Sequence, residues 1–238
     1  AEKNKIHLKD NGGVTTMEIL LDTANIEQIK KYVDLYEITG VTSNPTIISR
    51  EHAEFWPLLT EIKKIIGDRQ LHVQVTGETW EEMVKEAECI QAKLGKETYI
   101  KVPTTEQGIC AMKHLKATGS HVTATAVYTT QQAMMAASVG ADYVAPYFNR
   151  MNNLNVDSRK VIGDMVQLFR MHNKPTKILA ASFKNTEQVM DAFTVGAQAV
   201  TVSVDLLTTM VENAIIDFAV ENFKKDWVKT YGDKKIYE

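Results

Sequence analysis

The sequence predicts an α/β fold in a single domain, a closed (β/α)8 barrel of the TIM barrel type with an extra C-terminal helix. From Met17 onward, short runs rich in β-branched residues alternate with amphipathic helical patterns, and this alternation implies a parallel sheet. About eight such units occupy roughly 220 of the 238 residues, the usual size of a closed barrel. The main alternative is an open doubly wound sheet, which is disfavoured because no glycine-rich phosphate loop follows the first strand.

The predicted strands are short and bounded by helical or turn residues. In chain order they are MEILLD (17–22), EITGVT (37–42), LHVQVT (71–76), TYIKVP (98–103), HVTATAV (121–127), DYVAPY (142–147), KILAAS (177–182) and AVTVSV (199–204). The clearest helical patterns between them cover 26–36, 80–94, 106–119 and 161–172. Glycines follow several helical patterns, which suits the residue after a helix end: Gly67, Gly95, Gly119 and Gly140.

The two ends of the chain differ in character. Residues 1–16 are polar and lack an apolar signal core, so we expect a flexible N-terminal extension ahead of a barrel domain at 17–238. After Ser203 the pattern predicts one or two further helices, through about Trp227. This helical tail is therefore expected to lie beyond the last strand.

Composition excludes several classes of function. The formal net charge of −3 favours neither nucleic acid nor an anionic membrane as a partner. Cys89 and Cys110 stand alone and none of the six histidines has metal-ligand spacing, so we expect no metal, no other cofactor and no disulfide framework. With no apolar run long enough to cross a bilayer, a reducing cytoplasm is the expected location.

Nearly every predicted strand ends in a polar side chain. The residues are Asp22, Thr42 with Asn44, Gln74, Lys101, Thr125, Tyr147 and Ser182. Active sites of β/α barrels lie at the C-terminal ends of the strands, so their convergence on one rim predicts a site. Taken singly, some of them could instead cap the helices that follow: Asp22, Thr42 and Ser182.

Lys101 is the most informative of these residues, because it lies inside a predicted strand between Ile100 and Val102. Lysines are almost never fully buried unless they are paired or functional. A buried lysine has a lowered pKa, and the neutral amine can attack a carbonyl to form a Schiff base. Two alternatives remain open, an ion pair with Asp22 and a side chain that extends to the barrel mouth.

A second cluster follows the sixth and seventh strands. Arg150 and Ser182 lie where barrels commonly hold phosphate, with Lys184 just beyond them. Arginine offers a two-pronged donor for phosphate, and a serine hydroxyl adds another. The alternative is that Arg150 and Lys184 are ordinary solvated loop charges.

Six motifs together resemble one known family in order and spacing. They are LDTAN (21–25), GVTSNPTII (40–48), KVP (101–103), TATAVY (123–128), YVAPYFNR (143–150) and AASFKN (180–185). From Met17 to about Trp227 the chain is similar to the small transaldolase family, specifically its fructose-6-phosphate aldolase branch. The resemblance implies a class I aldolase in a (β/α)8 barrel, needing no metal, with the Schiff base on Lys101.

The resemblance also assigns roles to the other strand-end residues. It implies that Asp22 orients substrate hydroxyls and that Thr42 and Asn44 hold the dihydroxyacetone part of the substrate. Further implied groups position a catalytic water: Gln74, Thr125 and Tyr147. The phosphate is implied to be held by Arg150 and Ser182, with help from Lys184.

Three positions favour the aldolase branch over transaldolases: Gln74, Ala145 and Tyr147. In transaldolases these positions tend to hold Glu, Ser and Phe, respectively. A tyrosine hydroxyl can relay a proton to the enamine carbon, which would free dihydroxyacetone. The implied reaction is the cleavage and formation of fructose 6-phosphate from dihydroxyacetone and glyceraldehyde 3-phosphate. The alternatives are a transaldolase moving a dihydroxyacetone unit between sugar phosphates, a related anionic substrate such as a sulfo-sugar, and a non-catalytic sugar-phosphate binder.

The implied partners are phosphorylated ketose and aldehyde substrates and further copies of the same chain. The resemblance implies a homo-oligomer, a decamer of two pentamers, in which the C-terminal helix packs on a neighbour. The sequence itself shows only a helical tail with apolar residues such as Ile216, Phe218 and Phe223. The alternative is that the tail packs on its own barrel.

Overall fold

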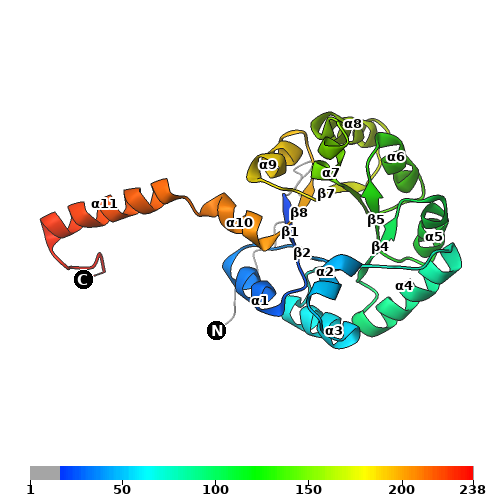
Figure 1. Cartoon of the computed structure of the whole chain (residues 1–238), viewed down its shortest axis with the longest axis horizontal. Helices are drawn as coiled ribbons and strands as arrows, with labels where there is room; N and C mark the ends of the chain where they lie inside the picture. The colour runs from blue at the N-terminus through cyan, green and yellow to red at the C-terminus, as the bar shows by residue number, and fades with distance from the viewer. Residues whose placement is uncertain (1–16, 238) are drawn as a thin grey trace.

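Eight parallel strands close into a barrel in the computed structural model, which describes residues 17–237. Neighbouring strands pair in sequence order and β8 pairs with β1, so the closed barrel is confirmed and the open doubly wound sheet is wrong. The predicted N-terminal extension, 1–16, lies outside the described residues. Figure 1 shows the helices of the barrel forming a ring around the strands.

Each predicted run overlaps one strand, and four of the eight strands end before their run does. The strands are β1 (Glu18–Asp22), β2 (Gly40–Thr42), β3 (Gln70–Gln74), β4 (Tyr99–Pro103), β5 (Val122–Val127), β6 (Tyr143–Pro146), β7 (Lys177–Ala180) and β8 (Ala199–Val202). The helices are α1 (Ile26–Leu35), α2 (Pro45–Arg50), α3 (Phe55–Ile66), α4 (Trp80–Leu94), α5 (Glu106–Ala117), α6 (Thr130–Ser138), α7 (Phe148–Asn153), α8 (Ser158–Met171), α9 (Thr186–Thr194), α10 (Val204–Val211) and α11 (Ala214–Tyr231).

The two faces of the strands have different chemistry, since side chains alternate along a strand. Outward-facing residues such as Val41, Val73 and Ile100 belong to the main hydrophobic core shared with the helices. The inward-facing apolar set is small, and includes Leu20 and Leu179. Barrel interiors are usually filled by apolar branched side chains, so the polar interior of this barrel requires explanation.

A hydrogen-bonded network fills the N-terminal half of the interior. Glu18, which is buried, accepts from the hydroxyl of Tyr143 and from the ammonium of Lys177. Gln70 donates its Nε2 to the Tyr143 hydroxyl over 3.0 Å, and its Oε1 lies 3.0 Å from Nε2 of His72. Burial and the bond to Glu18 raise the pKa of Tyr143, which therefore stays protonated.

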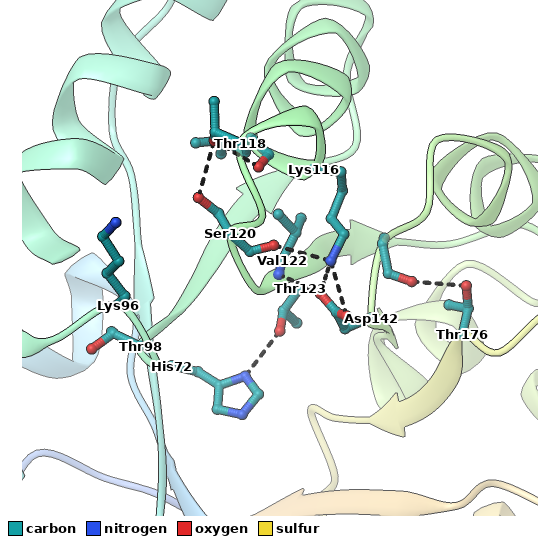
Figure 2. A network of polar contacts seen from close by, with 12 residues as sticks. His72, Lys96, Thr98, Lys116, Thr118, Ser120, Val122, Thr123, Asp142 and Thr176 are labelled. Atoms are coloured by element: carbon teal, nitrogen blue, oxygen red, sulfur yellow. Dashed lines mark hydrogen bonds and ion pairs between the residues drawn. The ribbon is translucent and has the colours of Figure 1, made fainter.

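His72 extends this network from Gln70 to Thr123 on β5. Its Nδ1 lies 2.9 Å from Oγ1 of Thr123, a contact that Figure 2 shows directly. The amide oxygen of Gln70 can only accept, so Nε2 of His72 carries the proton and Thr123 donates to Nδ1. Burial and the nearby charge of Lys101 hold the pKa of His72 well below its usual range, so the ring is neutral.

The tail forms two helices, and the second departs from the barrel. α10 contributes Val204 and Leu207 to the core, whereas α11 has no buried residue. Figure 1 shows α11 projecting away from the ring of helices, so this helix, unlike α10, does not pack on its own barrel. No helix among residues 17–237 is long and apolar enough to span a membrane.

Candidate active site

Three hydroxyl and carboxyl groups join the ends of β1, β2 and β8. Thr42 donates its hydroxyl to Oδ1 of Asp22 over 2.8 Å, and its oxygen lies 2.6 Å from the hydroxyl of Thr201. Because the single proton of Thr42 is directed to Asp22, Thr201 must donate to Thr42. Burial raises the pKa of Asp22, while the charge of Lys101 and the bond from Thr42 act in the opposite direction. The carboxylate is thus held in one orientation toward the barrel axis.

Lys101 lies on β4 with only 5% of its surface exposed, so a side chain extending to the mouth is wrong. Its Nζ donates to the main-chain carbonyl of Ser43 over 2.7 Å rather than to Asp22. Burial lowers the pKa of Lys101, and the charge of Asp22 raises it in part. A buried amine with a lowered pKa has the property that nucleophilic attack on a carbonyl requires.

The strand-end residues do not cap the following helices, in contrast to the alternative left open by the sequence for Asp22, Thr42 and Ser182. The caps are asparagines two or three residues further along. Asn25 accepts from Gln28 N at the start of α1, and Asn44 accepts from Ile47 N at the start of α2. Asn185 likewise caps α9. Helix capping therefore does not occupy the side chains of Asp22, Thr42 and Ser182, and the cap at Asn44 uses its amide oxygen and leaves its amide NH2.

Thr125 and Tyr147 form a pair across β5 and β6. Their hydroxyl oxygens lie 2.8 Å apart. Thr125 lies within an irregularity of β5, where the register shifts between Ala124 and Val127 and Ala126 adopts a φ of 57°. Bulges next to active sites re-aim side chains, and an alanine with positive φ costs backbone free energy. A left-handed alanine beside these two hydroxyls makes the segment a candidate for a functional role.

Gln74 is the third residue predicted to position a water. It ends β3 in direct register with Lys101, so the two side chains share the interior face. On its other side Gln74 borders a pocket of about 410 Å³ between α2, α3 and α4, lined also by Ile48, Trp56 and Glu86. No hydrogen bond within residues 17–237 joins Gln74 to the Thr125 hydroxyl or the Tyr147 hydroxyl.

Arg150 lies on α7 directly after β6, at the exposed rim. Its guanidinium carbon lies 4.7 Å from the centre of the Tyr147 ring, and its Nη1 donates to the hydroxyl of Tyr128 over 3.4 Å. Two aromatic residues thus hold a cation at the barrel mouth. A guanidinium in this place can donate to a phosphate from its remaining N–H groups.

Ser182 follows β7 in a left-handed conformation with a φ of 64°. Its carbonyl accepts from Asn149 N over 2.9 Å, which ties it to the segment that carries Arg150. Lys184 is exposed, and its backbone N–H donates to Gln188. Within the described part of the chain, no hydrogen bond or ion pair joins Lys184 to Arg150 or Ser182. The structure therefore brings Arg150 and Ser182 to one rim and leaves Lys184 at its edge.

Sequence reasoning missed three contributors to this site. Thr201 could have been found, since strand alternation in AVTVSV places it on the inward face. Tyr128 could have been suspected from its place at the end of a strand. Ser43 acts through its main-chain carbonyl, for which no sequence signal exists. Among residues 17–237, no group of three or more His, Cys, Asp or Glu side chains is placed to hold a metal ion.

Comparisons with known proteins agree with the sequence motifs. Residues 19–234 match the family described as "Transaldolase/Fructose-6-phosphate aldolase". A protein of Streptococcus pneumoniae named "Probable fructose-6-phosphate aldolase" is 43% identical over 222 residues, covering 92% of this chain and all of that protein.

Solved structures add support for the fold alone. Two structures of one flavocytochrome b2 double variant, one with sulfite and one with pyruvate bound, superpose with a TM-score of 0.56 at 10% identity. The match covers 80% of this chain and 57% of the flavocytochrome chains. At this identity the similarity concerns the architecture and carries no information on the reaction.

Proposed function

The chain belongs to the transaldolase/fructose-6-phosphate aldolase family, and from that premise we propose that it is a class I aldolase. Its substrate is fructose 6-phosphate, which it cleaves to dihydroxyacetone and glyceraldehyde 3-phosphate and forms in the reverse direction. The reaction passes through a Schiff base on Lys101.

One observation carries this proposal, the environment of Lys101. The amine is buried on β4, its pKa is lowered by burial, and a carboxylate on β1 is near enough to influence it. A lysine serving only stability would not require a polar rim with strained backbone around it. Here Ala126 and Ser182, both with positive φ, lie at the ends of β5 and β7.

The first half of the reaction uses Lys101 and Asp22. The neutral amine attacks the C2 ketone, and loss of one water gives a protonated imine. This cation accepts the electron pair of the C3–C4 bond as that bond breaks, while Asp22 takes the proton of the C4 hydroxyl. Glyceraldehyde 3-phosphate leaves, and a neutral enamine remains on Lys101.

The second half uses the hydroxyl pair of Tyr147 and Thr125, which lie 2.8 Å apart. Tyr147 delivers a proton to the enamine carbon, which regenerates the imine, and water then releases dihydroxyacetone. Thr125 and Gln74 orient that water. General acid catalysis of this kind contributes about 10²–10⁴ in rate.

The phosphate of the substrate is held at the rim by Arg150 and Ser182. Arg150 is kept over the ring of Tyr147, so phosphate binding and proton transfer are built on adjacent groups. Lys184 adds positive charge at the edge of the same site. A sulfonate of similar shape would satisfy the same donors.

Covalent trapping tests the proposal. The protein is incubated with dihydroxyacetone or fructose 6-phosphate, reduced with borohydride, and digested for peptide mass spectrometry. We expect a mass increase on Lys101 and on no other lysine. With a known class I aldolase trapping normally alongside, an unmodified Lys101 would refute the Schiff-base mechanism.

A transaldolase is the second candidate, because the family that matches this chain includes both activities. The two share the imine and differ in the fate of the enamine. Release of free dihydroxyacetone without an acceptor aldehyde supports the aldolase. Turnover that begins only when an acceptor aldehyde is added supports the transaldolase.

We also propose that α11 packs on a neighbouring copy of the chain in a homo-oligomer, a decamer of two pentamers. The helix carries an apolar stripe at helical spacing, formed by Ile216, Val220, Phe223 and Trp227. Ile216 and Phe223 are 53% and 69% exposed, so nothing among residues 17–237 covers the stripe. Light scattering is expected to give a mass well above 26.7 kDa, and a chain ending at Val211 is expected to dissociate.

The cytoplasm is the proposed location. Cys89 is exposed and Cys110 is partly buried, and both are free thiols. Free thiols of this kind persist in reducing compartments. Cell fractionation with an antibody to the chain would test this location.

A further inference from the structure

We propose that the main-chain carbonyl of Ser43 is a catalytic group that accepts the N–H of the Lys101 nitrogen throughout Schiff-base chemistry, held in place by its own hydroxyl. The inference rests on the proposed function, because it concerns the nitrogen on which the imine forms. It adds a group that no side-chain motif reveals.

The starting geometry is a hydrogen bond inside the barrel. Lys101 Nζ lies 2.7 Å from the oxygen of Ser43, and Ser43 is fully buried. A carbonyl has lone pairs and no proton, so it can only accept. The lysine nitrogen keeps at least one N–H as amine, carbinolamine, protonated imine and enamine. One acceptor can therefore serve every intermediate without rearranging.

This contact also fixes where the substrate carbon must lie. In the neutral amine, the hydrogen bond from one N–H to Ser43 fixes the direction of that N–H. The lone pair can then point only along the tetrahedral directions that remain. The protonated imine is planar and has a single N–H. With that proton directed at Ser43, the carbon of the C=N bond lies at about 120° from it, in the same plane. The carbonyl thus selects one orientation of the imine in the barrel mouth.

The acceptor is unusually well anchored. Ser43 donates both its backbone N–H, over 3.1 Å, and its hydroxyl, over 3.2 Å, to the carbonyl of His72. The ring of His72 is in turn bonded to Gln70 and Thr123 and stacks on Tyr99 with ring centres 4.5 Å apart. Figure 2 shows the ring of His72 pointing at Thr123. The position of the Ser43 oxygen is therefore set by β3 and its buried network.

The charge of the intermediate decides which step benefits. A hydrogen bond to a cation is stronger than one to a neutral group, and more so in a water-poor site. The bond to Ser43 therefore favours the protonated imine over both the neutral amine and the enamine. Condensation of amine and ketone with loss of water is helped, and so is the carbon protonation that returns the enamine to the imine.

A single carbonyl signal can test this directly, because the dipeptide Ser–Asn occurs once in the chain, at 43–44. Protein made with [1-¹³C]serine and [¹⁵N]asparagine gives one carbonyl–amide correlation by NMR, that of Ser43. On addition of dihydroxyacetone we expect the ¹³C signal to move downfield, as a stronger hydrogen bond requires. Borohydride trapping of the same sample shows whether Lys101 carries the adduct.

The outcomes separate the two proposals. An adduct on Lys101 with an unmoved Ser43 signal overturns the role of the carbonyl and leaves the aldolase intact. Absence of any adduct overturns the Schiff-base function and, with it, this inference. An adduct with a shifted signal supports both.

Substitutions of Ser43 test the same proposal through the rate of imine trapping. Ser43→Ala removes one of the two bonds that hold the carbonyl, and we expect imine trapping to slow about 2- to 10-fold, the range of one hydrogen bond. Ser43→Thr keeps a hydroxyl and should restore the rate. Ser138→Ala is the matched control, since its hydroxyl also donates to a main-chain carbonyl, but on the exposed surface of α6. A wild-type rate in Ser43→Ala would count against the anchoring hydroxyl, and where that variant fails to fold, the NMR measurement on the unaltered chain decides.

Discussion

The two halves of the barrel interior are both polar, yet their hydrogen bonding differs. In the N-terminal half, each member of the network from Lys177 through Glu18 to His72 is bonded to the next, with donors and acceptors matched. In the C-terminal half, Lys101 and Asp22 are buried together without a direct ion pair, each with its pKa shifted toward the neutral form.

The difference teaches how one fold assigns similar residues to different tasks. A fully matched network stabilises a unique packing, because its groups gain nothing from a further partner. A carboxylate and an amine held close but unpaired are ready to exchange protons and bonds with a ligand. Function in this barrel is therefore expected to reside where a buried amine and a buried carboxyl group lie close together without an ion pair.

The strongest test of that division is Lys101→Met, which keeps the length of the side chain and removes the nucleophile. We expect cleavage of fructose 6-phosphate to fall by at least about 1000-fold, since the covalent route is lost. The same measurement on Lys113→Met, an exposed position on α5, should give wild-type rates. Full activity in the Lys101 variant would end the proposed mechanism.

A tyrosine can be replaced by phenylalanine in each half of the interior, and the C-terminal half is expected to show the larger effect on activity. Tyr147→Phe removes a hydroxyl from the C-terminal half, and we expect release of free dihydroxyacetone to slow about 100-fold. Transfer to an added aldehyde should persist, because the enamine still forms. Product analysis by chromatography distinguishes the two reactions. Equal loss of both would mean that Tyr147 does not act on the enamine.

Arg150→Ala tests the phosphate end of the site. We expect KM for fructose 6-phosphate to rise about 10- to 100-fold, the range for hydrogen bonds to a charged group. Borohydride trapping with dihydroxyacetone, which has no phosphate, should be much less affected. Arg170→Ala, at an exposed position on α8, is the control. A similar loss with both substrates would assign Arg150 to positioning Tyr147 instead.

Tyr143→Phe is the counterpart in the N-terminal half. It leaves a buried oxygen of Glu18 and the amide of Gln70 without a partner, so we expect the free energy of unfolding to drop by about 1–3 kcal/mol. Activity per folded molecule should stay within about 2-fold. Urea unfolding and steady-state rates measure the two quantities. A large loss of kcat without loss of stability would extend the functional region into this network.

The smallest expected effect concerns pH. Because protonated Lys101 has no lone pair, imine trapping should slow as pH falls through the lowered pKa of this amine. Asp22 raises the pKa of Lys101, so Asp22→Asn should move this acid limb to lower pH. Between the lowered pKa of Lys101 in the folded chain and its pKa in the unfolded chain, the folded chain binds fewer protons at this residue than the unfolded chain does. Lys101 therefore makes the free energy of unfolding rise with pH across that interval. An acid limb that moves to higher pH in Asp22→Asn would contradict this effect of Asp22 on the pKa of Lys101.

The order of elements could be predicted from the sequence because strands and helices differ in their hydrophobic period. The run TYIKVP contains β4, and alternation along it correctly places Lys101 on the inward face. The ends of strands were predicted less well, since KILAAS ends as a strand at Ala180. There Ser182 adopts a left-handed conformation that ends the strand, and no residue type signals this.

Helix capping could not be decided from residue type for a related reason. Asp, Thr and Ser are good caps, so a cap at Asp22 or Thr42 was reasonable from residue type. The structure caps α1 and α2 with Asn25 and Asn44 instead, because the chain turns two or three residues past each strand before the helix begins. The length of that turn depends on the path that the chain follows from the end of the strand to the helix outside the barrel.

The sequence by itself determined the barrel class and the candidate nucleophile, because these follow from local periodicity and residue chemistry. Only the tertiary structure decided which atoms meet. The bond from Lys101 to Ser43 joins residues 58 positions apart, and that from Thr42 to Thr201 joins residues 159 apart. Such contacts depend on strand register and on closure of the barrel, which are properties of the whole chain.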